Sequence, residues 1–256
     1  MLALISPAKR LDLSPSPWGA HATQPALLDQ SQRLVACCRK LTPPDLQGLM
    51  SISEALAELN FQRFQDFQTP FTAQNAKPAA LTFAGDTYAG LNASEFDQAD
   101  WDFAQGHLGI LSGLYGLLRP LDLIQAYRLE MGTRLANERG KDLYAFWKER
   151  LTALVDERTA GHSDRRVINL ASKEYIKAVD PRALAESGVS IAFKEERGGA
   201  LKVIGLFAKK ARGTMASWMI RERLEDAEGL KGFTELGYGY REDLSSEVEW
   251  VFTRAS

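Results

Sequence analysis

The sequence is poor in the residues that mark metal-binding, secreted and membrane proteins. Its 256 residues contain two cysteines, Cys37 and Cys38, and three scattered histidines. There is no Cys-x-x-Cys pair, so we expect no metal site and no metal cofactor. Adjacent cysteines rarely pair with each other, which favours reduced thiols. No segment approaches the roughly 20 consecutive apolar residues of a membrane span.

Missing motifs and the overall composition exclude further classes of protein. The sequence has neither the G-x-G-x-x-G pattern of dinucleotide-binding proteins nor the lysine-containing P-loop of many nucleotide triphosphatases. The first apolar run stops at Ser6-Pro7, too early for a signal peptide, so we expect a cytoplasmic protein without a membrane partner. The charges balance to a net −2 and 45% of the residues are hydrophobic. This composition excludes a disordered chain and a uniformly basic nucleic-acid coat.

Strand-like and helix-like segments alternate without a repeat or an obvious linker. The expected strands cover residues 1–6, 79–84, 166–170, 189–195, 200–207, 233–240 and 248–253. The expected helices cover residues 26–41, 53–67, 97–111, 141–155 and 209–224. Because no linker divides the chain, we predict one domain over residues 1–256. A β-hairpin is also expected at Arg197-Gly198-Gly199, which favours a mixed sheet. The domain is a mixed α/β fold of α+β-like character, with a mixed sheet flanked by helices.

The charges are unevenly distributed despite their balance. Segment 86–102 has five acidic residues and no basic one, a net charge of −5. Segment 201–223 has six basic residues and one acidic residue, a net charge of +5. Three of its cations, Lys209, Lys210 and Arg212, fall in the expected first turn of a helix, where they oppose the helix dipole. This placement favours anion binding, and a solvated basic surface is the alternative.

Residues capable of chemistry follow four of the expected strands. In open α/β sheets, sites form outside the carboxyl ends of parallel strands. If most of these strands are parallel, the four groups meet in one cleft that suits a phosphate-bearing ligand. The groups are Ser6 and Lys9; Asp86 and Tyr88; Ser172, Lys173 and Tyr175; and Lys209, Lys210 and Arg212.

A glycine-bracketed turn lies between two segments that are expected to be helical. It consists of Gly113, Leu114, Tyr115 and Gly116, and two arginines, Arg119 and Arg128, follow it. In a helix-hairpin-helix module, such a turn donates backbone N–H groups to DNA phosphates while nearby cations add charge. The alternative is a tight connection that needs glycine only for its backbone angles.

Six motifs in order resemble the YaaA peroxide-stress protein family over nearly the whole chain. They are SPAK at 6–9, GDTYAGL at 85–91, LSGLYGLLRPLDLI at 111–124, YRLEMG at 127–132, NLASKEY at 169–175 and AKKARG at 208–213. The resemblance implies a cytoplasmic bacterial protein that is induced by hydrogen peroxide and limits unincorporated iron. It also implies DNA binding through a helix-hairpin-helix element and a basic cleft. The hairpin would be residues 113–116, and the cleft would use Lys9, Lys173, Lys209, Lys210 and Arg212.

Two functions of different classes follow. The first is a protector that binds DNA through its backbone or shape, with phosphate contacts from the hairpin amides, Arg119, Lys209, Lys210 and Arg212. The second is an enzyme acting on a nucleotide, nucleoside or modified base. In that hypothesis a buried Lys9 is the base or nucleophile, Asp86 is its acid–base partner, and the pocket also contains Ser6, Tyr88, Ser172 and Tyr175. No nucleophile–base–orienter triad can be identified from the spacing. Direct iron binding by the acidic segment 86–102 has little support.

Overall fold

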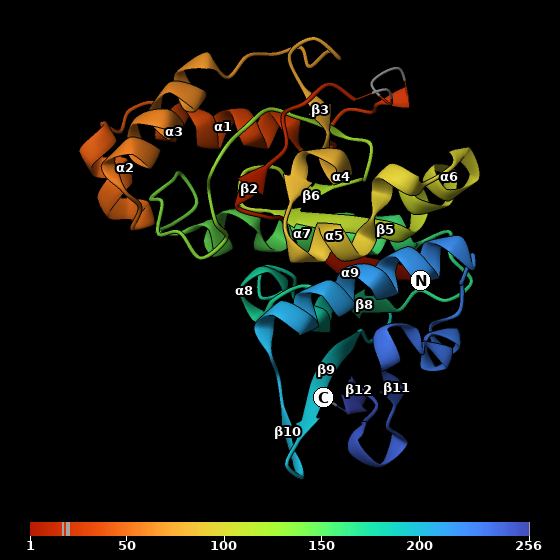
Figure 1. The fold of residues 1–256 in the computed structure, drawn as a ribbon. Coiled ribbons are helices and arrows are strands. Elements are labelled where there is room, and N and C mark those ends of the chain that lie inside the picture. The colour runs from red at the N-terminus through yellow and green to blue at the C-terminus, as the bar shows by residue number, and fades with distance from the viewer. Residues whose placement is uncertain (17, 19–20, 256) are drawn as a thin grey trace.

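A mixed eight-stranded sheet forms the centre of the protein. The computed structural model describes residues 1–16, 18 and 21–255, and Figure 1 shows the sheet with helices packed around it. The strand order is β11-β12-β9-β8-β1-β5-β6, with β10 paired to β9. The strands are β1 (Leu2–Ile5), β5 (Leu108–Ser112), β6 (Gly116–Leu118), β8 (Val167–Asn169), β9 (Val189–Arg197), β10 (Ala200–Lys202), β11 (Gly239–Tyr240) and β12 (Glu249–Ala255).

The central strands are parallel and the edges are antiparallel. β1 pairs in parallel with β5 on one side and with β8 on the other, and β8, β9 and β12 continue the parallel arrangement. β6, β10 and β11 pair antiparallel with their neighbours. These pairings confirm the predicted mixed α/β sheet. From β1 the chain first adds β5 on one side of β1 and later adds β8 on its other side. The carboxyl end of β1 is therefore a topological switch point, and ligands bind at such points in open α/β sheets.

Helices surround this sheet at the positions that the sequence mostly predicts. The helix expected at 53–67 is α3, and Ser53 caps it by accepting from the Leu56 amide. The helices are α1 (Leu28–Cys38), α2 (Pro43–Met50), α3 (Glu54–Asp66), α4 (Ala79–Thr82), α5 (Asp86–Leu91), α6 (Gln98–His107), α7 (Leu143–Thr159), α8 (Lys173–Ile176) and α9 (Gly205–Arg221). Small two-stranded sheets pair β2 (Arg10–Leu11) with β4 (Phe83–Ala84) and β3 (Lys77–Pro78) with β7 (Leu123–Ile124).

Four segment predictions were wrong in type or extent. Of the strand expected at 233–240, only Gly239–Tyr240 is a strand (β11), because Glu235–Gly237 forms a short 3-10 helix. Residues 79–84 form the short helix α4 followed by β4, which lies outside the main sheet. The apolar run is too short for its period to separate a strand from a buried helical turn. Of the helix expected at 97–111, only the part up to His107 is helical, because Leu108 begins the buried strand β5. The strand expected at 200–207 ends at Lys202, and α9 begins at Gly205. Lys209, Lys210 and Arg212 therefore lie beyond the first turn of α9, and their predicted placement against the helix dipole was wrong.

The glycine turn at 113–116 joins strands and not helices. It connects β5 to β6. These strands pair antiparallel, with Ile110 opposite Leu118 and Ser112 opposite Gly116. Gly116 has a φ of +74°, and a Cβ on Gly113 would lie 2.2 Å from the Leu129 carbonyl oxygen. The glycines are therefore needed for backbone conformation and close packing, and the helix-hairpin-helix prediction is not confirmed at this turn. The helical hairpin in the described chain is α2–α3, joined through Ser51 at φ +52°.

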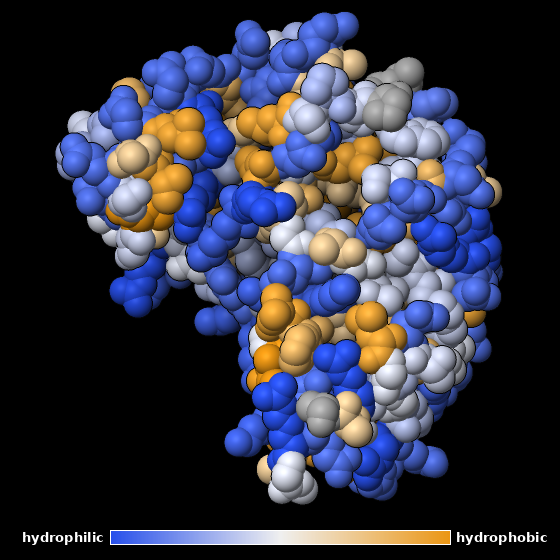
Figure 2. Space-filling model, viewed as in Figure 1, coloured by the Kyte–Doolittle hydropathy of each residue, from blue (hydrophilic) through white to orange (hydrophobic). Residues whose placement is uncertain are grey.

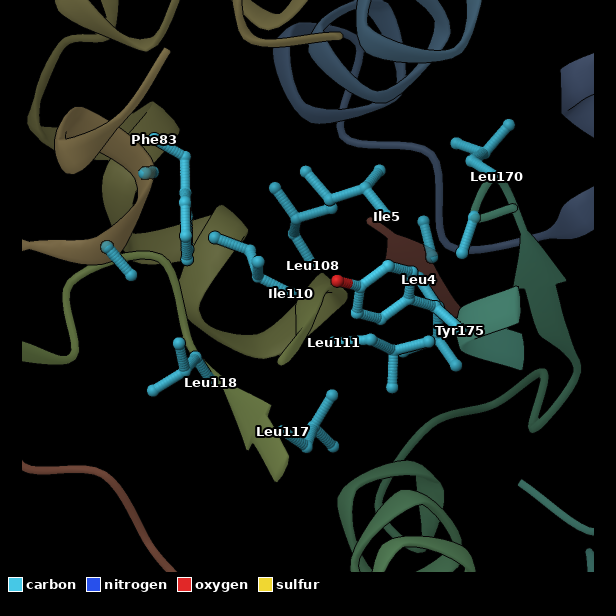
Figure 3. Packing of buried hydrophobic residues seen from close by; sticks show 14 of the residues in the cluster. Leu4, Ile5, Phe83, Leu108, Ile110, Leu111, Leu117, Leu118, Leu170 and Tyr175 are labelled. Atoms are coloured by element: carbon cyan, nitrogen blue, oxygen red, sulfur yellow. The ribbon is translucent and has the colours of Figure 1, made fainter. Parts of the chain in front are cut away.

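The core spans both faces of the central strands. All four residues of β1 and all five of β5 are buried, as expected for strands covered by helices on both sides. Figure 3 shows Leu4 and Ile5 packing with Ile110 and Leu111 around the ring of Tyr175. Among the described residues, no helix combines the length and apolar character needed to cross a membrane.

Candidate functional site

A cavity of about 460 Å³ opens beside the carboxyl ends of β1 and β8. Its walls come from the loop after β1, the start of α5, segment 127–130, α8 and α9. Its polar lining side chains are Ser6, Lys9, Arg10, Asp86, Thr87, Tyr88, Tyr127, Arg128, Glu130, Ser172, Glu174, Tyr175, Lys209 and Arg212. All four groups predicted from the strand ends contribute to this cavity. Two of the groups arrive on α5 and α9 and do not follow parallel strands of the main sheet.

Two glycines let α5 and α9 approach backbone to backbone. A Cβ on Gly213 would lie 1.8 Å from the Thr87 carbonyl oxygen, and one on Gly90 would lie 2.2 Å from the Lys210 carbonyl oxygen. Figure 1 shows the two helices side by side above the sheet. Their contact brings Asp86 and Tyr88 of α5 to the same cavity as Lys209 and Arg212 of α9.

Ser6 connects three walls of the cavity through hydrogen bonds. Its Oγ accepts a hydrogen bond from the Ser172 amide at 2.9 Å, and its carbonyl oxygen accepts one from the Tyr88 hydroxyl at 3.0 Å. Ser6 therefore links the end of β1 to α5 and to the start of α8. The described contacts give this hydroxyl a supporting role and no neighbouring base that would activate it as a nucleophile.

Glu130 neutralises part of the positive charge that Lys9 and Arg128 bring to the cavity wall. Its carboxylate lies 3.1 Å from the Lys9 Nζ and 3.1 Å from the Arg128 guanidinium. One negative charge is thus shared by two cations. Among the described residues Lys9 pairs with Glu130 and has no ion pair with Asp86, so the predicted Lys9–Asp86 acid–base couple is not assembled in this structure. The predicted burial of Lys9 was also wrong, because its side chain is 65% exposed.

Two guanidinium groups of the cavity have buried nitrogens without a hydrogen-bond partner. These are the Nε atoms of Arg128 and Arg212. Arg128 still bonds Glu130 through its terminal nitrogen, whereas no ion pair or hydrogen bond to the Arg212 side chain occurs among the described residues. Burial lowers the pKa of Arg212, because removing a cation from water disfavours its charged form. An arginine nevertheless stays protonated at neutral pH, so Arg212 retains an uncompensated charge.

The tyrosines of the cavity supply neutral hydroxyls. Burial is the main cause that raises the pKa of Tyr88, Tyr127 and Tyr175 above that of free tyrosine. The Tyr127 hydroxyl is 2.6 Å from the Ser112 Oγ, and the Tyr88 hydroxyl donates to Ser6. These groups stay protonated at neutral pH and are not poised as phenolate bases.

The two further carboxylates of the cavity differ in their partners. The Glu174 Oε1 accepts a hydrogen bond from the Gly132 amide at 2.8 Å, which fixes the segment after Met131. Asp86, the first residue of α5, has no hydrogen bond or ion pair among the described residues. The cavity therefore contains one carboxylate and one guanidinium, on α5 and α9, that are both available to a ligand.

Several predicted site residues lie elsewhere. Lys173 and Lys210 are exposed and do not line the cavity, and Arg119 lies 3.4 Å from its ion-pair partner Asp122. The turn residues Gly113, Leu114, Tyr115 and Gly116 are buried in the core, where a duplex does not reach them. The cavity also contains five polar side chains that were not predicted, and four of them lie in the motifs at 85–91, 127–132 and 169–175. They are Arg10, Thr87, Tyr127, Glu130 and Glu174.

The acidic segment is partly used by the fold. Asp97 caps α6 in a reciprocal arrangement with Asp100, and Arg223 donates to the Asp100 carboxylate at 2.8 Å. Part of the +5 segment thus pairs with part of the −5 segment. This pairing does not extend to Lys209 and Arg212 in the cavity.

The surface beside the cavity combines charge with apolar side chains. On the face shown in Figure 2, hydrophobic surface gathers over the connection between β10 and α9. Val203 and Leu206 in this connection are 60% and 57% exposed, and Lys209 follows them on the exposed side of α9.

Comparisons with known proteins agree with the motif resemblance. The family model described as "Peroxide stress protein YaaA" matches residues 1–244. A UPF0246 protein of Cellvibrio japonicus is 52% identical over 254 residues, covering 99% of this chain and 98% of that protein. One of Magnetococcus marinus is 52% identical over 256 residues, covering both chains completely, and one of Alteromonas mediterranea is 50% identical over 254 residues, covering 99% and 98%. The chain therefore belongs to the YaaA family of peroxide stress proteins.

Proposed function

We propose that this YaaA-family protein acts in the cytoplasm by binding DNA and thereby limits iron-dependent damage during peroxide stress. The DNA backbone lies across the mouth of the cavity, where Lys9, Lys209 and Arg212 contact phosphates. Membership of a peroxide stress family supports the cellular context. Recognition is through backbone and shape, since the cavity presents cations and hydroxyls and no helix placed for a groove.

The observation that carries this proposal is the uncompensated charge of Arg212. A partly buried cation with an unpartnered, buried Nε costs free energy in the folded protein. An anionic ligand removes that cost when its oxygens bond the guanidinium. The exposed Lys209 on the same helix adds a second positive charge near the opening.

Fluorescence anisotropy of a labelled duplex at several salt concentrations tests the proposal. Each phosphate that the protein neutralises contributes about −0.9 to the slope of log K against log salt. We expect a clearly negative slope that becomes shallower by about one in Arg212→Gln and Lys209→Gln. Arg182→Gln is the matched control, because Arg182 is 84% exposed and pairs with Asp180. Binding that does not depend on salt contradicts the proposal.

A second candidate function is catalysis on a nucleotide, nucleoside or modified base. The unpartnered Asp86 in the cavity favours it, because a carboxylate in such a site is suited to acid–base chemistry. Asp86→Asn separates the two functions. It abolishes turnover if Asp86 is an acid–base group, and it preserves or increases duplex affinity if the protein only binds DNA.

A further inference from the structure

The cavity is of the wrong size and shape for a continuous duplex. Its volume of about 460 Å³ lies within the roughly 300–1,000 Å³ that is typical of small-ligand sites. A duplex can cross the opening but cannot enter. The two unpartnered guanidinium nitrogens nevertheless belong to residues that line the cavity itself. A small anion that enters the cavity can therefore reach both guanidinium groups, whereas a duplex contacts Arg212 only from the opening.

We propose that the cavity binds one nucleoside monophosphate unit, with its phosphate between Arg128 and Arg212 and its sugar or base directed to Asp86. This inference rests on the proposed function, because the unit is either free or the 5′-phosphorylated end of a DNA strand. The chemistry is the same for both sources.

The phosphate position follows from the distribution of charge. Glu130 compensates only one charge of the pair Lys9 and Arg128, and Arg212 has no anionic partner among the described residues. A phosphate monoester carries more negative charge than an internal phosphodiester and offers three terminal oxygens. Two guanidinium groups can bond those oxygens in planar, charge-assisted arrangements. The monoester therefore fits this wall better than an internal phosphate does.

The orientation follows from Asp86. An ionised carboxylate only accepts hydrogen bonds, so it repels a phosphate and attracts a donor. Sugar hydroxyls and exocyclic base amines are such donors, and Asp and Glu accept from the cytosine amine in known complexes. A bare phosphate ion satisfies the guanidinium groups and leaves Asp86 without a partner. Both ends of the site are satisfied together only by a ligand with an anionic end and a donating end.

Isothermal titration calorimetry with deoxycytidine 5′-monophosphate, deoxycytidine and inorganic phosphate tests this site. We expect the monophosphate to bind at least about tenfold more tightly than either fragment. Arg212→Gln weakens monophosphate binding by about tenfold or more and leaves deoxycytidine unaffected. Arg212→Lys loses part of the affinity, because it keeps the charge without the planar fork. Asp86→Asn reduces the preference for the monophosphate over inorganic phosphate. The exposed neighbour Lys210 supplies the control, and Lys210→Gln leaves all affinities unchanged.

A 5′-phosphorylated single strand and its unphosphorylated twin identify the source. Tighter binding of the phosphorylated strand than of free monophosphate assigns the site to a strand end, and the reverse assigns it to a free nucleotide. The site is disproved if the monophosphate binds no better than phosphate, or if Arg212→Gln leaves its affinity unchanged in a folded protein.

A duplex with hydroxyl ends, titrated in parallel, separates this inference from the proposed function. Salt-dependent duplex binding without monophosphate binding keeps the proposed function and overturns the inference. Monophosphate binding without duplex binding overturns the proposed function and leaves a site for free nucleotides.

Discussion

Two arginines near opposite ends of the central strands have opposite surroundings. Arg166, just before β8, donates to Asp164 at 2.8 Å, to Asp226 at 2.9 Å and to Glu228 at 2.7 Å. The hydrogen bond to Asp164 is the main cause that raises its pKa. Arg212, in the cavity beyond the carboxyl ends, has a buried Nε without a partner, and burial lowers its pKa.

This difference separates a cation that stabilises the fold from one that is available to a ligand. Carboxylates surround Arg166 and connect β8 to the segment at 226–228, so its charge is satisfied within the protein. Arg212 is held in place by the packing of α9 against α5 and not by a counter-charge. The two arginines therefore differ in the counter-charges around them and not in residue type.

The largest expected effect on stability comes from a substitution that disrupts the contact between α5 and α9 beside Arg212. Gly213→Ala places a Cβ 1.8 Å from the Thr87 carbonyl oxygen, so α5 and α9 must separate. We expect the free energy of unfolding to fall by about 3 kcal/mol or more, measured by urea denaturation. Gly48→Ala is the control, because Gly48 lies exposed within α2 with no atom within 4 Å of an added Cβ. It should stabilise the protein by about 0.5–1 kcal/mol, and similar behaviour of the two variants contradicts the close approach.

The second largest effect on stability is expected from the substitution of Arg166. Arg166→Gln leaves the Asp164 carboxylate, whose side chain is 10% exposed, without its charged partner. We expect a loss of about 2 kcal/mol in the free energy of unfolding. The exposed pair of Arg182 and Asp180 gives the comparison, since Arg182→Gln should change stability by less than about 0.5 kcal/mol. Equal losses in the two variants would mean that the Arg166 network is no stronger than a surface pair.

The same substitution at the other end of the sheet should act in the opposite direction. Arg212→Gln removes a cation that burial disfavours and that has no carboxylate to compensate it. We expect the free energy of unfolding to stay constant or rise by about 1–2 kcal/mol, while duplex affinity falls. A clear loss of stability in thermal and urea unfolding would show that Arg212 supports the fold as Arg166 does.

The smallest effect is a dependence on pH at the Arg166 end. Burial would raise the pKa of Asp164, but hydrogen bonds from Arg166 and the Ala227 amide outweigh it and lower the pKa to about 2. The ordinary value is 3.8, so the stabilisation is complete above that pH and is lost as pH falls through about 2. We expect this loss to be about 1 kcal/mol, since solvent screens the pair. Urea unfolding at pH 5 and pH 2.5 measures it, and the wild-type advantage over Arg166→Gln should shrink at the lower pH.

The sequence predicted the fold where the local pattern was unambiguous. The apolar run before Pro7 became the central strand β1, and the helix expected at 53–67 is α3. The turn at 113–116 was misread, because glycines serve helical and strand connections equally well. Its pairing depends on long-range contacts, such as the one between Gly113 and Leu129, that the local sequence does not reveal.

The site was predicted in part for a similar reason. Lys9, Asp86 and Arg212 were predicted to meet in one cleft, and all three line the cavity. The convergence relies on the glycine-mediated contact of α5 with α9, which is a packing property and not a strand direction. The sharing of Glu130 by Lys9 and Arg128 was invisible in the sequence, because no spacing rule relates residues 9 and 130.

The role of Arg212 is tested by comparing the salt dependence of duplex binding between wild type and Arg212→Gln. We expect a negative slope of log K against log salt for the wild type, and a slope shallower by about one in the variant. Arg166→Gln, measured at a temperature where it is folded, should keep the wild-type slope. A flat wild-type slope, or the same slope in Arg212→Gln, would contradict the claim that the unpartnered cation of the cavity binds a DNA phosphate.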